Sequence, residues 1–376
     1  MSGSSNVDSP DLGAPAPDAA VGESLSPETI ATALSERVRG QDAAVREMAI
    51  ALYKKLRGLS SANILLLGSS GTGKTTLMRA VEDYLASHSD LTGESVVIRI
   101  HAKVLAEESE QSRAGEGVLR RLIDRGREVA GLDADVDDLV ERATRGIVFV
   151  DEIDKIRARV GGAANVEGIR AQEALLTLIE NEAVPLRLPD WAGGRVVTFD
   201  SSHILFVCGG AFEGLYEAVY DRVTVGDDRG LLQPVTTVRG GSVQQELQFT
   251  LSDWLRLEDL FGYGMTPQFL SRFDARIVLN DLPEDVLLQI FLENADSSLS
   301  LSQAYFEDRG YRLAISPAAA RRIAVEAAGQ PRLGARALKE IFHQVIAPYE
   351  FEPEARSTNG AIMIDLEEVE AALGGD

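Results

Sequence analysis

The chain has 376 residues, of which 45% are hydrophobic and 26% charged, a composition typical of a globular protein with about two or three domains. The formal net charge of -22 argues against a nucleic-acid or anionic-membrane surface as the main function, because phosphates are bound through clustered Lys and Arg. The single cysteine, Cys208, excludes an intrachain disulfide and a cysteine zinc site.

No apolar run approaches the roughly 18 residues that a membrane-spanning helix needs. The N-terminal residues contain neither the basic nor the apolar segment of a secretory signal. We therefore expect a cytoplasmic protein without a membrane partner.

Residues 1–26 are rich in Ser, Gly, Pro, Ala and Asp and contain no basic residue, which predicts a disordered acidic tail. Ser26 and Pro27 form a typical helix start, and the apolar spacing predicts helices over residues 27–37 and 42–56.

The next stretch predicts a phosphate-binding loop. Residues 64–67 are apolar and indicate a buried strand, and residues 68–75 (GSSGTGKT) match G-x-x-x-x-G-K-S/T before a helical pattern. In such a loop, glycines let backbone N–H groups surround phosphate oxygens, Lys74 reaches the β- and γ-phosphates, and the Thr75 hydroxyl binds Mg²⁺. A glycine-rich turn that matches by chance is the alternative, and the strand–loop–helix context argues against it. The predicted cofactors are ATP and Mg²⁺, and the predicted nucleotide-binding residues of this loop are Gly71, Thr72, Gly73, Lys74, Thr75 and Thr76.

A second buried strand ends at two acidic residues, Asp151 and Glu152, within the sequence GIVFVDEIDK. Further strands are predicted over residues 95–100, 203–208 and 277–279, and residues 196–199 predict a short strand or half of a hairpin. Ligands of an open α/β sheet bind beyond the carboxyl ends of its strands, so both acids should lie near the phosphate-binding loop. We predict that Asp151 coordinates Mg²⁺ and that Glu152 polarises the attacking water, although two solvated acids at a strand end are the simpler alternative.

Between these strands, residues 106–117 and 226–241 read as loops, and residues 118–129, 132–144 and 172–182 as helices. From Leu282 onward helical periods dominate, with helices predicted over residues 283–294, 317–328, 335–345 and 366–373. The predicted fold is therefore α/β, a large domain with a parallel sheet between helices, followed by a small, mainly helical domain. The predicted boundaries are 1–26 for the tail, 27–279 for the large domain and 280–376 for the small domain.

Taken in order, these motifs resemble the AAA+ ATPases, and most closely the ClpX family of protein unfoldases. The similar segments are VRGQ at 38–41, ILLLGSSGTGKT at 64–75, RGIVFVDEIDK at 145–155, ALLTLIE at 174–180, HILFVCGGAF at 203–212, PQFLSRF at 267–273 and LGARALKEI at 333–341. The resemblance implies that Val38 and Arg39 pack against adenine. It implies that Arg272 is an arginine finger reaching a neighbouring subunit of a hexameric ring, and that Arg336 contacts the nucleotide of its own subunit.

The chain also departs from the ClpX pattern at four places. It has no four-cysteine zinc domain, no aromatic residue in the segment 106–117, no Ile-Gly-Phe tripeptide within 226–241, and only two arginines in the short segment 185–196. In the family these features recognise substrate, grip the polypeptide and bind the protease. Their absence removes the usual support for threading and for a ClpP-type protease partner.

The sequence thus predicts an ATP-hydrolysing, ring-forming chaperone or remodeller that acts on protein partners, with Glu152, Arg272 and Arg336 as its catalytic residues. One alternative is a nucleotide-dependent assembly switch or scaffold that does not thread a polypeptide. The absence of an aromatic residue from the segment 106–117 favours this alternative. A DNA-acting AAA+ motor is the other alternative, and the acidic balance argues against it.

Overall fold

The computed structural model describes residues 25–89, 95–108, 115–180, 183–226, 234–239, 242–247 and 249–374, with the backbone alone over 234–247. The predicted acidic tail lies outside these residues except for its last two. Residues 109–114 of the predicted loop at 106–117 also lie outside the described residues. So do residues 227–233, 240 and 241 of the predicted loop at 226–241.

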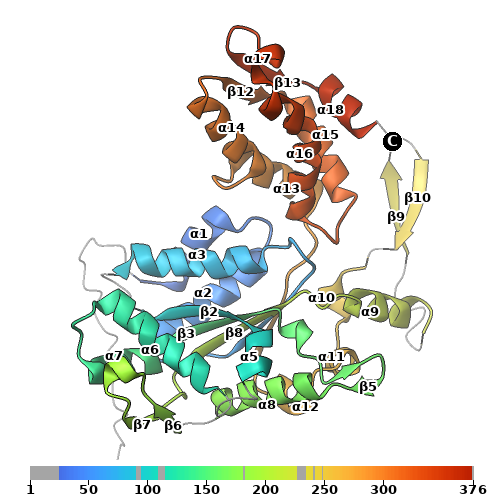
Figure 1. The fold of residues 1–376 in the computed structure, drawn as a ribbon. Helices are drawn as coiled ribbons and strands as arrows, with labels where there is room; N and C mark the ends of the chain where they lie inside the picture. Colours follow the sequence, from blue (N-terminus) through green and yellow to red (C-terminus); the bar gives the residue numbers. More distant parts are fainter. Residues whose placement is uncertain are drawn as a thin grey trace, which may run out of the picture.

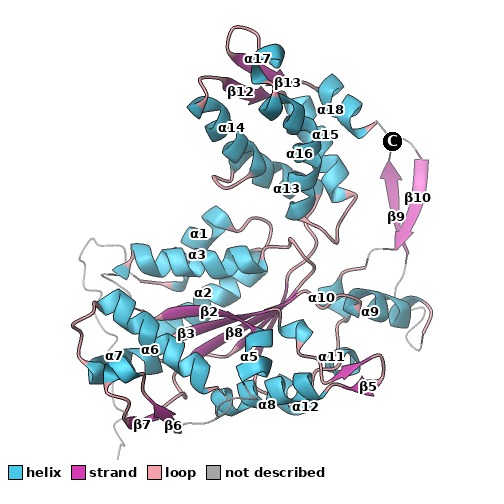
Figure 2. Ribbon diagram, viewed as in Figure 1, coloured by secondary structure: helices cyan, strands magenta, loops and turns pink. Residues whose placement is uncertain are grey.

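A five-stranded parallel sheet forms the centre of residues 25–279, which we call the α/β region (Figures 1 and 2). Its order is β11-β1-β8-β3-β2, and every neighbouring pair is parallel. The strands are β1 (Ile64–Leu67), β2 (Val97–His101), β3 (Ile147–Asp151), β8 (Leu205–Gly210) and β11 (Ala275–Val278). The predicted parallel α/β fold is confirmed.

Both faces of the sheet are covered by helices, which explains why β1 and β3 are almost continuously apolar. Ile64, Leu66 and Phe149 pack with the helices of one face, and Leu65 and Val148 pack with those of the other. The first face carries α1 (Pro27–Arg37), α2 (Asp42–Leu56) and α3 (Lys74–Ser87) (Figure 1). The second carries α5 (Ala102–Glu108), α6 (Glu116–Ala130), α7 (Val136–Thr144) and α8 (Val166–Glu180).

Several predicted element bounds shift in the structure. Helices α5 and α6 occupy both ends of the predicted loop at 106–117. Helix α7 begins at Val136, not at residue 132, because the Asp135 carboxylate caps it by accepting from the N–H groups of Asp137 and Asp138. Strand β8 continues two residues beyond Cys208, through Gly209 and Gly210.

Short hairpins and helices complete the α/β region. The predicted strand at 196–199 pairs in an antiparallel hairpin, and two further hairpins were not predicted. The strands are β4 (Arg159–Val160), β5 (Ala163–Ala164), β6 (Val184–Arg187), β7 (Val196–Phe199), β9 (Pro234–Arg239) and β10 (Ser242–Leu247). The remaining elements are α9 (Leu215–Thr224), α10 (Leu251–Trp254), α11 (Leu257–Tyr263), α12 (Pro267–Leu270) and the single turns η1 (Ile153–Lys155) and η2 (Asp190–Ala192).

Residues 280–374, which we call the helical region, have a hydrophobic core of their own drawn from Leu282 to Val369. The elements are α13 (Glu284–Glu293), α14 (Ser298–Asp308), α15 (Pro317–Ala328), α16 (Ala335–Phe351), α17 (Pro353–Arg356) and α18 (Leu366–Leu373), with β12 (Arg312–Ile315) parallel to β13 (Ala361–Ile364). Helix α16 extends six residues beyond its predicted end at 345 and includes Pro348.

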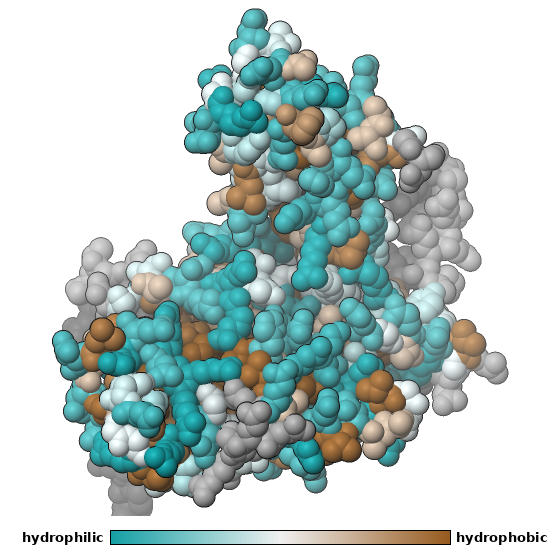
Figure 3. All heavy atoms as spheres, in the orientation of Figure 1, coloured by the Kyte–Doolittle hydropathy of each residue, from teal (hydrophilic) through white to brown (hydrophobic). Residues whose placement is uncertain are grey.

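The helical region stands at one end of the α/β region (Figure 1). On the face shown in Figure 3, hydrophilic residues predominate and apolar residues are scattered among them in small groups. Among the described helices, none is both long and apolar enough to cross a membrane.

Candidate functional site

The phosphate-binding loop connects β1 to α3 and depends on glycines. Gly71 has φ +75° and Gly73 has φ +106°, backbone conformations that residues with a Cβ atom rarely adopt. Lys74 opens α3, and its ammonium donates to the carbonyl oxygens of Gly68 at 2.5 Å and Ser69 at 2.8 Å. Burial lowers the pKa of Lys74 to about 8, while the carboxylates of Asp151 and Asp154 oppose this shift.

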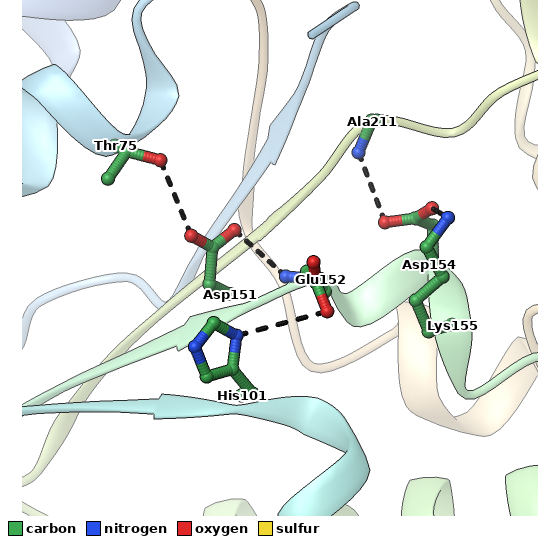
Figure 4. A network of polar contacts seen from close by, with 7 residues as sticks. All are labelled: Thr75, His101, Asp151, Glu152, Asp154, Lys155 and Ala211. Atoms are coloured by element: carbon green, nitrogen blue, oxygen red, sulfur yellow. Dashed lines mark hydrogen bonds and ion pairs between the residues drawn. The ribbon is translucent and has the colours of Figure 1, made fainter.

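The carboxyl end of β3 places Asp151 beside this loop (Figure 4). The Thr75 hydroxyl lies 3.3 Å from the Asp151 carboxylate, to which it donates, and the other carboxylate oxygen accepts from the Glu152 N–H at 2.9 Å. A hydroxyl and a carboxylate are the oxygen ligands that Mg²⁺ prefers, and Mg²⁺ commonly takes its other ligands from substrate phosphates and water. Thr75 and Asp151 therefore fit the predicted magnesium site.

Glu152 has a left-handed backbone, with φ 57° and ψ 38°, which is costly for a residue with a side chain and is found most often at functional sites. This conformation turns the chain sharply from β3 into η1. The Glu152 carboxylate is about half exposed and lies 3.8 Å from Nδ1 of His101, the last residue of β2. This exposure leaves the Glu152 carboxylate, which lies beside Asp151, accessible to solvent.

Asp154 is a site residue that the sequence did not single out. It is 1% exposed, and one carboxylate oxygen accepts from the Ala211 N–H at 3.1 Å, which joins η1 to the end of β8 (Figure 4). The other oxygen lies 3.3 Å from the Lys155 ammonium. A Cβ atom at Gly210 would lie 2.8 Å from the Asp154 carboxylate, so the glycine pair ending β8 was the available signal.

The helical region closes the site from the opposite side. Arg336, on the first turn of α16, lines a cavity of about 450 Å³ together with the phosphate-binding loop and the β3 end. The Ala335 N–H donates to the Gly71 carbonyl at 3.1 Å, and a Cβ atom at Gly71 would overlap the Leu333 carbonyl. The volume is within the range of small-molecule sites.

Most predicted site residues meet at this cavity, and four do not. The lining includes Gly71, Gly73, Lys74, Thr75, Thr76, Asp151, Glu152 and Arg336. Val38 is buried in the core beside α1, Arg39 lies 3.7 Å from Glu293 of the helical region, and Thr72 donates back to Ser69. Arg272 follows α12, is about half exposed, and pairs with Glu180 at the end of α8.

Gln41 is a second residue that the sequence did not single out as a contact. Its side-chain amide donates to the Thr72 carbonyl at 3.0 Å and to the Asn280 carbonyl at 2.8 Å, and its oxygen accepts from the Asn280 N–H. Gln41 therefore ties the phosphate-binding loop to Asn280, the first residue of the helical region.

Comparison with known proteins shows the family to which this chain belongs. Residues 59–276, more than half of the chain, match the family described as AAA domain (Cdc48 subfamily). The chain is 30% identical to "ATP-dependent Clp protease ATP-binding subunit ClpX 3" of Methylococcus capsulatus, over 92% of this chain and 80% of that protein. It is 29% identical to ClpX 2 of Wolinella succinogenes, over 87% and 77% of the two chains, and 30% identical to ClpX of Bacteroides fragilis, over 87% and 76%. The chain therefore belongs to the AAA+ ATPases, and within them to the ClpX type.

Proposed function

We propose that this chain is an ATP-hydrolysing, ring-forming chaperone or remodeller that acts on a protein partner. The observation that carries the proposal is the meeting of Lys74, Thr75, Asp151 and Glu152 with Arg336 of the helical region at one cavity. A nucleotide bound there would contact both regions, so its hydrolysis could change how they sit on each other. The similar proteins are named as ATP-binding subunits of a Clp protease, which supports an action on protein substrates.

In this proposal each residue acts on the triphosphate of ATP. Lys74 would leave the loop carbonyls and bind the β- and γ-phosphates. Thr75 and Asp151 would hold Mg²⁺, which would neutralise developing charge on the phosphates. Glu152 orients the attacking water and accepts its proton. The planar guanidinium of Arg336 neutralises the transferring phosphoryl group. Val38 and Arg39 would instead lie near the adenine, as the resemblance to the family implies.

Arg272 is proposed to complete the site of a neighbouring subunit, since it is absent from the lining of its own cavity. Arg272→Ala should lower kcat roughly 10³-fold while leaving the Kd for ATP nearly unchanged. The measurement is ATP turnover and mass in solution across protein concentrations. For the wild type, turnover should rise with concentration as a hexamer-sized species appears with ATP.

Arg276→Ala is the matched control, since Arg276 is an exposed arginine on β11, close to Arg272 in sequence. It should leave turnover unchanged. Turnover by Arg272→Ala at the wild-type rate would contradict the proposed ring site.

The assembly switch remains the second candidate, because the segment 106–117 contains no aromatic residue to grip a polypeptide. Tight ATP binding with negligible turnover at every protein concentration would favour it. Stimulation of turnover by an unfolded protein, and not by double-stranded DNA, would favour the remodeller and argue against a DNA motor.

The pKa of Lys74 predicts how ATP affinity depends on pH. Because burial lowers this pKa to about 8, the ammonium loses its proton as pH rises through that value, and the neutral amine cannot pair with phosphate. The Kd for ATP should therefore be nearly constant below about pH 8 and rise above it, by up to about tenfold per pH unit. Calorimetric titrations in buffers of different ionisation enthalpy should show proton uptake near pH 8. Affinity that does not change between about pH 7 and 9.5 would contradict the assignment.

A further inference from the structure

Arg332, in the connection between α15 and α16, crosses from the helical region to the α/β region. Its guanidinium donates to the Glu217 carboxylate at 2.6 Å and lies 3.8 Å from the centre of the Tyr216 ring. Tyr216 and Glu217 both belong to the first turn of α9. One side chain therefore makes an ion pair and a stacking contact across the two regions.

The residues that follow Arg332 are those that touch the nucleotide cavity. The Leu333 carbonyl lies against Gly71, the Ala335 N–H donates to the Gly71 carbonyl, and Arg336 lines the cavity. On the other side, α9 follows Ala211 and Glu213, which also line the cavity. The Arg332 contact thus joins the two chain segments that flank the cavity.

This contact orients the Arg332 side chain more than it stabilises the packing of the two regions. The side chains of Arg332 and Glu217 are 42% and 58% exposed, and an ion pair so exposed contributes little by itself. Stacking on Tyr216 adds a preferred plane for the guanidinium, which lysine cannot reproduce. Asp281, at the start of the helical region, also feels the Arg332 charge, which opposes the burial that raises the pKa of Asp281.

We infer that Arg332 is a positioning residue for ATP hydrolysis, which holds the start of α16 against α9 so that Arg336 stays at the cavity. This inference rests on the proposed function in one respect, that Arg336 acts on ATP. Arg332 itself does not line the cavity, so its effect must pass through the placement of the residues after it.

The first test measures turnover by variants on both sides of the contact. Arg332→Ala should lower kcat by about 10- to 100-fold, because small misplacements of catalytic groups are costly. Glu217→Gln and Arg332→Lys each keep part of the contact and should give intermediate losses. Combining Arg332→Ala with Arg336→Ala should be no worse than Arg336→Ala alone, since the first residue acts through the second. Additive losses would overturn the inference.

Arg309→Ala is the matched control. The Arg309 guanidinium also faces an aromatic ring, that of Tyr305 at 5.7 Å, and bonds to the Glu350 carbonyl, but all of these residues belong to the helical region. This variant should keep the wild-type kcat.

The second test needs no nucleotide. Spin labels on Ser87→Cys in α3 and Glu354→Cys in α17, both exposed positions, report the distance between the regions, while the buried Cys208 stays unlabelled. Arg332→Ala should broaden this distance distribution, and Arg309→Ala should not. An unchanged distribution would overturn the inference even if the chain hydrolyses ATP. If the wild type did not bind ATP, the proposed function would be refuted. The distance test would still decide whether Arg332 holds the two regions together.

Discussion

Replacing Lys74 with alanine should leave little ATP bound at concentrations that only just saturate the wild-type chain. The Lys74 ammonium is buried at the start of α3 and lines the cavity. Removing one partner of a buried charge pair costs about 2–5 kcal/mol, which corresponds to roughly a 30- to 4000-fold rise in Kd. The measurement is calorimetric titration with ATP and Mg²⁺.

The chain offers a matched control in Lys55, at the end of α2. Burial also lowers the pKa of Lys55 to about 8, and its ammonium donates to the His203 carbonyl, but it does not line the cavity. Lys55→Ala should therefore keep the wild-type Kd for ATP. Equal losses in both variants would show that a general effect of removing a lysine, and not phosphate binding, explains the result.

The sequence could predict the phosphate-binding loop and the acids of β3 because each depends on a short local pattern. A run of four apolar residues, a glycine motif and a helical period each specify their own backbone. The closeness of Thr75 and Asp151 followed from a general rule, since the carboxyl ends of parallel strands share one edge of the sheet. The comparisons support the fold that these patterns indicated.

Contacts between distant segments could not be predicted in this way. Asp154 meets the Ala211 N–H only because Glu152 adopts a left-handed backbone and η1 turns the chain back toward β8. The contact of Arg332 with Tyr216 depends on how two regions with separate hydrophobic cores sit on each other. No periodicity in either segment specifies its partner.

Local patterns also failed where a helix is rich in polar residues. Helix α14 buries Leu299, Ser302 and Phe306, but four of its first eight residues are serine or glutamine, which hides the apolar spacing. Ser297 caps this helix by accepting from the Ser300 N–H at 3.1 Å, so a serine-rich stretch for which no element was predicted is in fact a helix start. Strand β12 was missed because it is short and pairs only with the distant β13.

Glu152→Gln should bind ATP with nearly the wild-type Kd and lower kcat by about 10²- to 10⁴-fold. Glutamine keeps the shape of the side chain. The backbone N–H of residue 152, which donates to the Asp151 carboxylate, is unchanged, so the magnesium ligands should stay in place. An amide, however, cannot take a proton from water at neutral pH. Single-turnover hydrolysis of radiolabelled ATP, measured beside equilibrium binding, separates the two effects.

Glu213→Gln is the control for this substitution, because Glu213 also lines the cavity but comes from the segment between β8 and α9. It should retain most of the wild-type turnover. Hydrolysis by Glu152→Gln at the wild-type rate would remove Glu152 from the proposed mechanism.

A chain that holds ATP without hydrolysing it also separates the two candidate functions. If the protein is a remodeller, the Glu152→Gln ring should capture an unfolded protein in the presence of ATP and fail to release it, since release would need the hydrolysis step. If the protein is an assembly switch, the same ring should form with ATP but bind no unfolded protein, because a switch of this kind would act only by assembling with ATP. Because both outcomes start from the same trapped complex, capture by Glu152→Gln tests the partner independently of the rate of turnover.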